Sequence, residues 1–244
     1  MTNTAIDQFV TLDEIRAARK RIQGVAVYTP MLEVAFPAPH APYAQQALWL
    51  KAENLQPMGA FKIRGAFNMI SQLPKAQLAR GVITYSSGNH GQAVALAAQR
   101  TGAKAVIVMP TTAPQVKIDG CKSYGAEVIM AGTTSLDRQA RAETEARERG
   151  LTIVPPFDHR QIVIGQGTAG LEILEQCPDV GTVFVPAGGG GLVSGVPAAI
   201  KQAKPSVRIV ALSAHTEQHY VQEMLRAGAI GYVDKYSALE NLAR

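Results

Sequence analysis

The chain has 244 residues, 47% of them hydrophobic, which is enough for one large domain or two small ones around a buried core. Its net charge of +5 comes from scattered basic residues without a basic run interleaved with aromatics, so nucleic-acid binding has little support. The polar N-terminus does not resemble a signal peptide, and no apolar run is long enough to cross a membrane, so no membrane association is expected.

The composition also favours one fold class. Aromatic residues make up 6% of the chain and alanine, glycine and valine are abundant, which suits helices packed on a parallel sheet better than an all-β core. The two cysteines, Cys121 and Cys177, have neither metal-ligand spacing nor a disulfide framework. We therefore expect reduced thiols, no metal site and a cytoplasmic location.

Strand-like and helical segments alternate along the chain. A capping box from Thr11 to Glu14 begins a helix that runs to about Gln23, and Gly102 and Gly150 end later helices. We expect strands at residues 48–53, 81–85, 103–109, 127–130, 152–154, 182–185, 208–212 and 231–233. We expect further helices at residues 62–73, 92–100, 114–124, 136–149, 167–176, 192–204, 218–227 and from 237. The alternation predicts an α/β protein with parallel, doubly wound sheets and sites at the carboxyl ends of strands.

Lys62 stands where a strand-like run gives way to a helix, with Gly59 and Gly65 close by. Glycines let a backbone or a flat ligand come close. The positive end of a helix disfavours a protonated amine, which pushes the lysine towards a neutral nucleophile. Taken alone, Lys62 is more simply a solvated surface lysine, so its interpretation depends on the other loops.

Four consecutive glycines, Gly188 to Gly191, follow a buried-type strand and precede a helix. Their N–H groups and the helix terminus form a cradle for an anion of the size of phosphate, and a flexible linker is the weaker alternative at such a junction. A nucleoside triphosphate is not expected because the P-loop pattern is absent, and a dinucleotide fingerprint is not convincing.

A third junction, Ser86-Ser87-Gly88-Asn89-His90-Gly91, places hydroxyls, an amide and an imidazole at a tight turn before a helix. These groups can bind a carboxylate or a ring oxygen, although His90 by itself is more simply a helix-start capping residue. A serine hydrolase is a poor fit, because no G-x-S-x-G elbow is present. Such junctions can converge on one crevice, and a phosphate cradle, a lysine and polar ring contacts together indicate pyridoxal phosphate held as a Schiff base.

Four motifs carry a family resemblance, at residues 51–56, 59–66, 86–91 and 188–192. Together, and in this order, they resemble the serine/threonine dehydratases, which are pyridoxal-phosphate enzymes of the tryptophan-synthase-β fold close to serine racemase. The resemblance covers about residues 10–205. It implies two α/β domains: part of a large domain with the phosphate loop at residues 1–57 and 148–206, and a small mobile domain at residues 58–147 that closes over the substrate.

The resemblance also implies roles for individual residues. Lys62 would form the Schiff base and later remove the substrate's α-proton, Phe61 would pack against the cofactor ring, and Asn89 would hydrogen-bond the ring hydroxyl. The cofactor phosphate would be bound by Gly188, Gly189, Gly190, Gly191 and Leu192. Ser87 would be a second catalytic group on the opposite side of the substrate. The substrate carboxylate would be held by Ser86, Ser87, Gly88, Asn89 and His90.

The implied reaction is that of a pyridoxal-phosphate-dependent ammonia-lyase, or dehydratase, which converts L-threonine or L-serine to a 2-oxo acid and ammonia. Racemisation of serine is the close alternative, because Ser87 could return a proton to the other face, and an O-acetylserine-type synthase fits less well. The alternative of another class is a catalytically impaired cofactor-binding or scaffold protein. The family is often dimeric, so a homodimer is expected by analogy.

The tail departs from this pattern, and the dehydratase resemblance is expected to end near residue 206. Segments within residues 207–244 resemble the second half of a response-regulator receiver domain, as a flavodoxin-like tail that completes the sheet. The switch hydroxyl, aromatic and lysine positions would be Ser213, Tyr232 and Lys235. The phosphoacceptor half is absent, so phosphorylation signalling is not expected. A natural fusion, a truncation, a chimera and a plain α/β continuation stay open.

Overall fold

The computed structural model describes residues 10–34, 47–214 and 229–236. The chain forms two compact units. Unit 1 consists of Met1–Arg16, Tyr28–Ala52 and Gly167–Arg244, and unit 2 of Ala17–Val27 and Glu53–Gln166. Two helices, α2 (Leu12–Arg21) and α8 (Arg160–Gln176), contribute residues to both units. In the described part of the chain, no helix has the length and apolar character of a membrane span.

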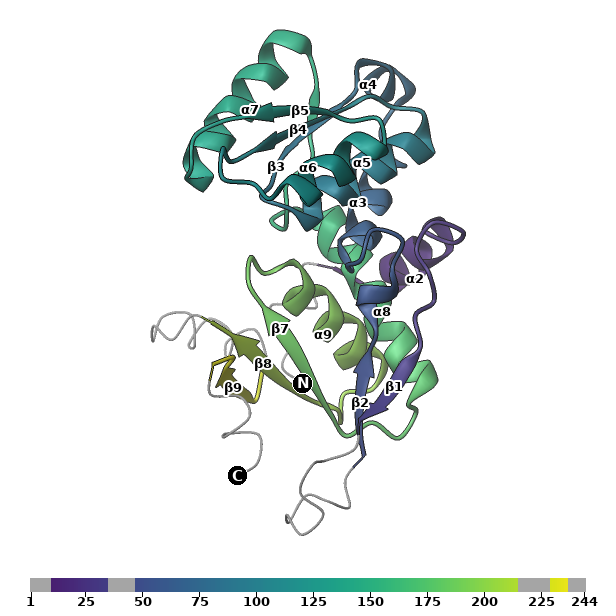
Figure 1. Cartoon of the computed structure of the whole chain (residues 1–244). Coiled ribbons are helices and arrows are strands. Elements are labelled where there is room, and N and C mark those ends of the chain that lie inside the picture. The colour runs from purple at the N-terminus through teal and green to yellow at the C-terminus, as the bar shows by residue number, and fades with distance from the viewer. Residues whose placement is uncertain (1–9, 35–46, 215–228, 237–244) are drawn as a thin grey trace. The chain divides into compact units, whose positions relative to one another are not determined.

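Unit 2 is built on a four-stranded parallel sheet with the order β5-β4-β3-β6. Its strands are β3 (Val82–Tyr85), β4 (Ala105–Met109), β5 (Glu127–Met130) and β6 (Thr152–Ile153). Its further helices are η1 (Glu53–Leu55), α3 (Lys62–Ile70), α4 (Lys75–Arg80), α5 (Asn89–Thr101), α6 (Gln115–Ser123) and α7 (Ser135–Arg149). Helix α7 lies on one face of the sheet, and α5 and α6 lie on the other (Figure 1).

Strands β3 and β4 are apolar on both faces because each face has its own core. Ile83, Val106 and Val108 pack with α7, whereas the alternate residues Val82 and Ile107 pack with α3 and α5. A strand buried on both sides gives a continuous apolar run in the sequence, as a parallel sheet requires. The carboxyl end of β3 leads directly into the polar loop of residues 86–90.

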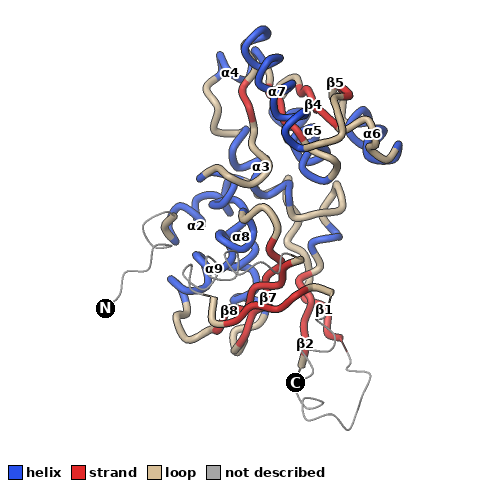
Figure 2. Tube along the Cα trace, turned by 90° about the vertical axis from the view of Figure 1, so that its left-hand side faces the viewer, coloured by secondary structure: helices blue, strands red, loops and turns tan. Residues whose placement is uncertain are grey.

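Unit 1 contains the antiparallel pair β1 (Met31–Val34) and β2 (Leu48–Lys51) and a second parallel sheet. That sheet has the order β7-β8-β9 and consists of β7 (Thr182–Ala187), β8 (Arg208–Ser213) and β9 (Gly231–Asp234). Figure 2 shows β7 and β8 as adjacent strands. Helix α9 (Gly191–Ala203) packs its valines onto β7, so the glycine-rich turn between them is anchored on both sides.

The predicted α/β class with parallel sheets is confirmed. The predicted capping box is present, since Thr11 N donates to Glu14 Oε2 (2.9 Å) and Glu14 N to Thr11 Oγ1 (3.3 Å). The predicted helix ends at Gly102 and Gly150 are also confirmed, because both glycines adopt the left-handed conformation. The helices expected at 218–227 and from 237 lie outside the described residues.

Several predicted boundaries are wrong: α3 ends at Ile70 and not at 73, and α5 begins at Asn89 and not at 92. Helix α4 was not predicted. The strand expected at 48–53 ends at Lys51, because η1 begins at Glu53, whose carboxylate binds the Arg64 guanidinium through contacts of 2.7 and 2.8 Å. Helix α8 begins at Arg160 and not at 167. Its first half is rich in β-branched residues and glycine, which lowers helix propensity, but three of these residues, Ile162 to Ile164, are buried, and tertiary packing overrides propensity.

Candidate functional site

Lys62 is the first residue of α3 in unit 2 and is not a solvated surface lysine. Its Nζ donates to the main-chain oxygen of Pro156 at 2.7 Å and lies 5.3 Å from the centre of the Phe61 ring. Burial lowers the pKa of Lys62 from 10.5 to about 8, so the neutral, nucleophilic amine is accessible near physiological pH. The sequence predicted this direction from the helix end, but the cause is burial.

The main chain after β6 anchors three elements of unit 2 at once. Val154 O accepts hydrogen bonds from Thr84 Oγ1 (2.7 Å) and from His90 Nε2 (3.1 Å), and Pro156 O accepts the Lys62 amine. Thr84 belongs to β3, His90 to α5 and Lys62 to α3. The segment from 154 to 156 therefore fixes the lysine and the polar loop against one another.

His90 is a buried, neutral imidazole. Burial and, to a smaller extent, the charge of Lys62 lower the pKa of His90 to about 3. Because Nε2–H donates to Val154 O, Nδ1 carries the lone pair, and this atom has no partner among the described residues. The expectation that His90 caps α5 is therefore wrong, since its side chain turns to the main chain after β6 and leaves one buried acceptor unused.

The loop between β3 and α5 exposes polar groups on an ordered backbone. Ser86 N donates to Val108 O (2.9 Å), and Ser86 Oγ accepts from Gly88 N (3.1 Å). Ser87 and Asn89 are exposed. Asn89 Oδ1 accepts a hydrogen bond from Lys117 Nζ of α6 at 2.7 Å. Motif reasoning missed Lys117, because it is 28 residues from Asn89 and only the packing of α5 beside α6 brings the two together.

The glycine loop of unit 1 joins β7 to α9. Gly190 is the N-cap of α9 with φ of 98°, a backbone conformation that side chains other than glycine rarely adopt. A Cβ at Gly188 or Gly190 would meet nothing within 4 Å, so the space beside the loop is open. The first N–H groups of a helix lack intrahelical acceptors, and the loop therefore offers unhindered donors to an anion.

The predicted site residues fall in both units. Lys62, Phe61 and the loop from Ser86 to His90 lie in unit 2, where the structure brings them together around residues 154–156. Gly188 to Leu192 lie in unit 1. Lys235 of the tail also belongs to unit 1, and its Nζ donates to Ala187 O at 3.2 Å, next to the glycine loop.

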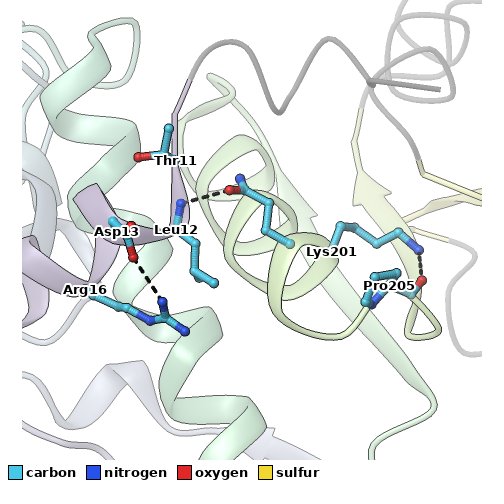
Figure 3. A pocket seen from close by; sticks show the side chains of 7 residues that line it. Thr11, Leu12, Asp13, Arg16, Lys201 and Pro205 are labelled. Atoms are coloured by element: carbon cyan, nitrogen blue, oxygen red, sulfur yellow. Dashed lines mark hydrogen bonds and ion pairs between the residues drawn. The ribbon is translucent and has the colours of Figure 1, made fainter. Parts of the chain in front are cut away.

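A shallow open pocket in unit 1 offers no comparable chemistry (Figure 3). Its polar groups bind one another: Arg16 donates to Asp13 Oδ1 (3.0 Å), Leu12 N to Gln202 Oε1 (2.8 Å) and Lys201 Nζ to Pro205 O (2.5 Å). These groups are already satisfied within the chain, so we assign no function to this pocket.

Comparison with known proteins shows to which family the chain belongs. The family model described as "Pyridoxal-phosphate dependent enzyme" matches residues 22–240. The chain belongs to this family. The cofactor of the family is pyridoxal phosphate, and the lysine, the polar loop and the glycine loop all lie within the matched residues.

Individual relatives include both enzymes that the sequence suggested. The chain is 45% identical over 199 residues to a threonine dehydratase of Solanum lycopersicum, covering 77% of this chain and 33% of that protein. It is 39% identical over 224 residues to serine racemase of Schizosaccharomyces pombe, covering 92% and 68%. The solved threonine deaminase isoform 2 of Solanum lycopersicum has a TM-score of 0.81 at 36% identity, covering 94% of this chain and 65% of that one. The chain thus spans about a third of the tomato dehydratase.

The tail belongs to the same family match. The expected end of the resemblance near residue 206 is wrong, because the family model continues to residue 240. The receiver-like interpretation of residues 207–244 finds no support, and β8 and β9 simply continue the parallel sheet of β7. A short alternation of strands and helices is common to many α/β folds, which is why it suggested a receiver domain.

Proposed function

We propose that the protein is a pyridoxal-phosphate-dependent ammonia-lyase that converts L-threonine or L-serine to a 2-oxo acid and ammonia. The observation that carries this proposal is the partly buried Lys62 amine, with a pKa lowered to about 8, which is held near the Ser86–His90 loop by the main chain of residues 154–156. The similarity to a threonine dehydratase supports this reaction, and a small amino acid is the proposed substrate.

The residues present fit the cofactor. Lys62 supplies the amine for the aldehyde, and the phosphate matches the open donors of Gly188, Gly189, Gly190, Gly191 and Leu192. Phe61 offers its ring as a neighbour, and Asn89 offers its amide Nδ2, since its Oδ1 is bound to Lys117. When bound, pyridoxal phosphate supplies an electron sink for the charge that develops at the substrate's α-carbon.

Lys62 is the proposed base for the α-proton. An amine with a pKa of about 8 is partly neutral near pH 7, so Nζ can accept this proton and release it afterwards. Pro156 O accepts a hydrogen bond from Nζ and holds the amine in one direction when it is not bonded elsewhere.

The Ser86–His90 loop is the proposed carboxylate site. The exposed Ser87 hydroxyl and the groups at the start of α5 can donate to a carboxylate, and the positive end of α5 favours its negative charge. Neutral His90 contributes no charge but holds the loop through Val154 O. Loss of the α-proton and the β-hydroxyl as water would leave an enamine, and water would hydrolyse its imine tautomer to the 2-oxo acid and ammonia.

A covalent label tests the proposal. The protein is purified with pyridoxal phosphate, reduced with borohydride and digested, and we expect the reduced cofactor on the peptide that contains Lys62. Lys62→Ala should abolish the label, whereas Lys75→Ala, which changes an exposed lysine of unit 2, should leave it intact. Absence of a label on Lys62 would refute the enzyme assignment. A label without 2-oxo acid release from threonine or serine would favour an inert cofactor-binding protein.

Serine racemisation is the second candidate, favoured by the exposed Ser87 and by the similarity to a serine racemase. In deuterium oxide, a racemase converts L-serine to D-serine that carries deuterium at the α-carbon, which chiral chromatography with mass detection resolves. We expect Ser87→Ala to abolish any racemisation while 2-oxo acid release persists. Equal loss of both activities would instead favour the carboxylate-binding role of Ser87 over a role in proton return.

A homodimer and a cytoplasmic location complete the proposal. The first rests on analogy with the family and the second on two free cysteines, of which Cys121 is buried. Light scattering of the purified protein measures the mass in solution, and the mass of a single chain would refute the dimer.

A further inference from the structure

Lys117 makes a specific contact at the candidate ring-binding residue. Its Nζ donates to Asn89 Oδ1 at 2.7 Å, and its methylene groups cross the turn before Asn89, since a Cβ added to Gly88 would lie 3.6 Å from both Cδ and Cε. The lysine is only partly exposed. Both its stem and its charged end are therefore placed on the loop from Ser86 to His90.

No carboxylate among the described residues competes for this ammonium. In the described part of the chain, the Lys117 side chain has no ion-pair partner, and Asn89 is its one hydrogen-bond acceptor. Asp119, on the same helix, accepts from Gln115 at 2.8 Å. Cys121 lies one turn further along, and burial raises its pKa to about 11, so its thiol carries no charge near neutral pH.

The contact decides which way the Asn89 amide points. An asparagine side chain has one acceptor end and one donor end, and an ammonium group can only donate. With Lys117 on Oδ1, the donor Nδ2 is presented on the other side, whereas a flipped amide would set two donors against each other. An acceptor facing Asn89 from outside therefore meets Nδ2.

We propose that Lys117 is a positioning residue, which locks the Asn89 amide so that its Nδ2 donates to the ring oxygen of pyridoxal phosphate. This inference rests on the proposed function. The nearby positive charge also favours the anionic form of that oxygen, because an opposite charge stabilises an ionised group. Lys117 thus tunes both the affinity for the cofactor and the electronic state of its ring.

Three variants test this role. Lys117→Met removes the donor, Lys117→Arg retains a cationic donor, and Lys122→Met removes the same charge from an exposed position of the same helix. The readouts are the dissociation constant of pyridoxal phosphate, measured by fluorescence, and the ratio of the visible to the near-ultraviolet absorbance band of the bound cofactor. Thermal unfolding without cofactor checks that each variant is folded.

We expect Lys117→Met to raise the dissociation constant about fivefold and to lower the band ratio, consistent with loss of one charge-assisted hydrogen bond. Lys117→Arg should restore most of both values, and Lys122→Met should change neither. In an Asn89→Ala background, Lys117→Met should have little additional effect on affinity, because the lysine affects binding through the Asn89 amide, whereas its direct charge effect on the band ratio should persist.

Two results overturn the inference alone. In one, wild-type protein binds the cofactor but Lys117→Met keeps the wild-type affinity and band ratio. In the other, Lys117→Met weakens binding equally in the wild-type and the Asn89→Ala backgrounds. Wild-type protein that binds no pyridoxal phosphate would overturn the proposed function as well, so the two failures are distinguishable.

Discussion

Replacing Lys62 by methionine is expected to stabilise the cofactor-free protein at neutral pH. Burial lowers the pKa of Lys62 from 10.5 to about 8, so the folded state holds the proton less tightly than the unfolded state does. This difference corresponds to about 3 kcal/mol. Methionine has a similar length and removes that cost, but it also removes the hydrogen bond to Pro156 O, worth about 1 kcal/mol. The net gain at pH 7 is about 2 kcal/mol.

The pH dependence of this effect has a definite sign. Between about 8 and 10.5 the unfolded state binds more protons at Lys62 than the folded state, so wild-type stability rises with pH in that window. The advantage of Lys62→Met is therefore full below about pH 8 and disappears as the pH approaches 10.5. Above that pH the wild type should be more stable by about 1 kcal/mol, because its neutral amine still donates to Pro156 O.

Denaturant unfolding of both proteins without cofactor, between pH 7 and 11, measures this difference. Lys75→Met serves as the control, because this lysine is exposed, and it should change the free energy of unfolding by less than about 0.5 kcal/mol. A Lys62→Met protein that is no more stable than wild type at pH 7 would refute the reasoning, as would a stability difference that does not change with pH.

Three further substitutions in unit 2 are expected to lower the free energy of unfolding by different amounts in the same assay. Gly165→Ala should destabilise by about 2 kcal/mol, because its Cβ would lie 2.6 Å from the main-chain oxygen of Arg64, which cannot move aside. Gly120→Ala should cost little stability, although its Cβ would lie 2.2 Å from Gln92 Nε2, because the end of this side chain can move aside. Equal losses of stability in the Gly165→Ala and Gly120→Ala variants would contradict this contrast. Thr134→Ala removes the capping box of α7 and should cost about 1 kcal/mol, and an unchanged midpoint would count against that role.

Local sequence patterns predicted most of the architecture. The strand at Glu127–Met130 was predicted with its observed bounds, and helix ends at Gly102 and Gly150 followed from the need for a left-handed residue there. Elements whose stability depends on distant partners were missed. β1, for example, is held by pairing with β2, from which it is separated by residues 35–47, and its four residues carry no alternation.

The candidate site likewise divides into features that local sequence predicted and features that depend on distant contacts. Residue types and their order indicated Lys62, the glycine loop and the polar loop, because these motifs are local in sequence. The lowered pKa of Lys62 depends on how deeply the fold buries it, and Lys117 reaches Asn89 only through the packing of α5 and α6. The orientation of the His90 side chain could not be predicted either, because its hydrogen-bond partner is a main-chain oxygen 64 residues away.

The anchoring role of Val154 and Pro156 has a consequence for how relatives of this protein can vary. Both residues act through carbonyl oxygens, which every amino acid possesses, but the Val154 side chain is also fully buried in the core. Position 156 is therefore the freer of the two, whereas position 154 is restricted to apolar side chains of similar size. Two homologues could thus differ at position 156 and still hold their reactive lysine in the same place. A search for invariant residues would overlook the Pro156 carbonyl, and in an engineering library position 156 would tolerate diversity so long as the course of the backbone is kept.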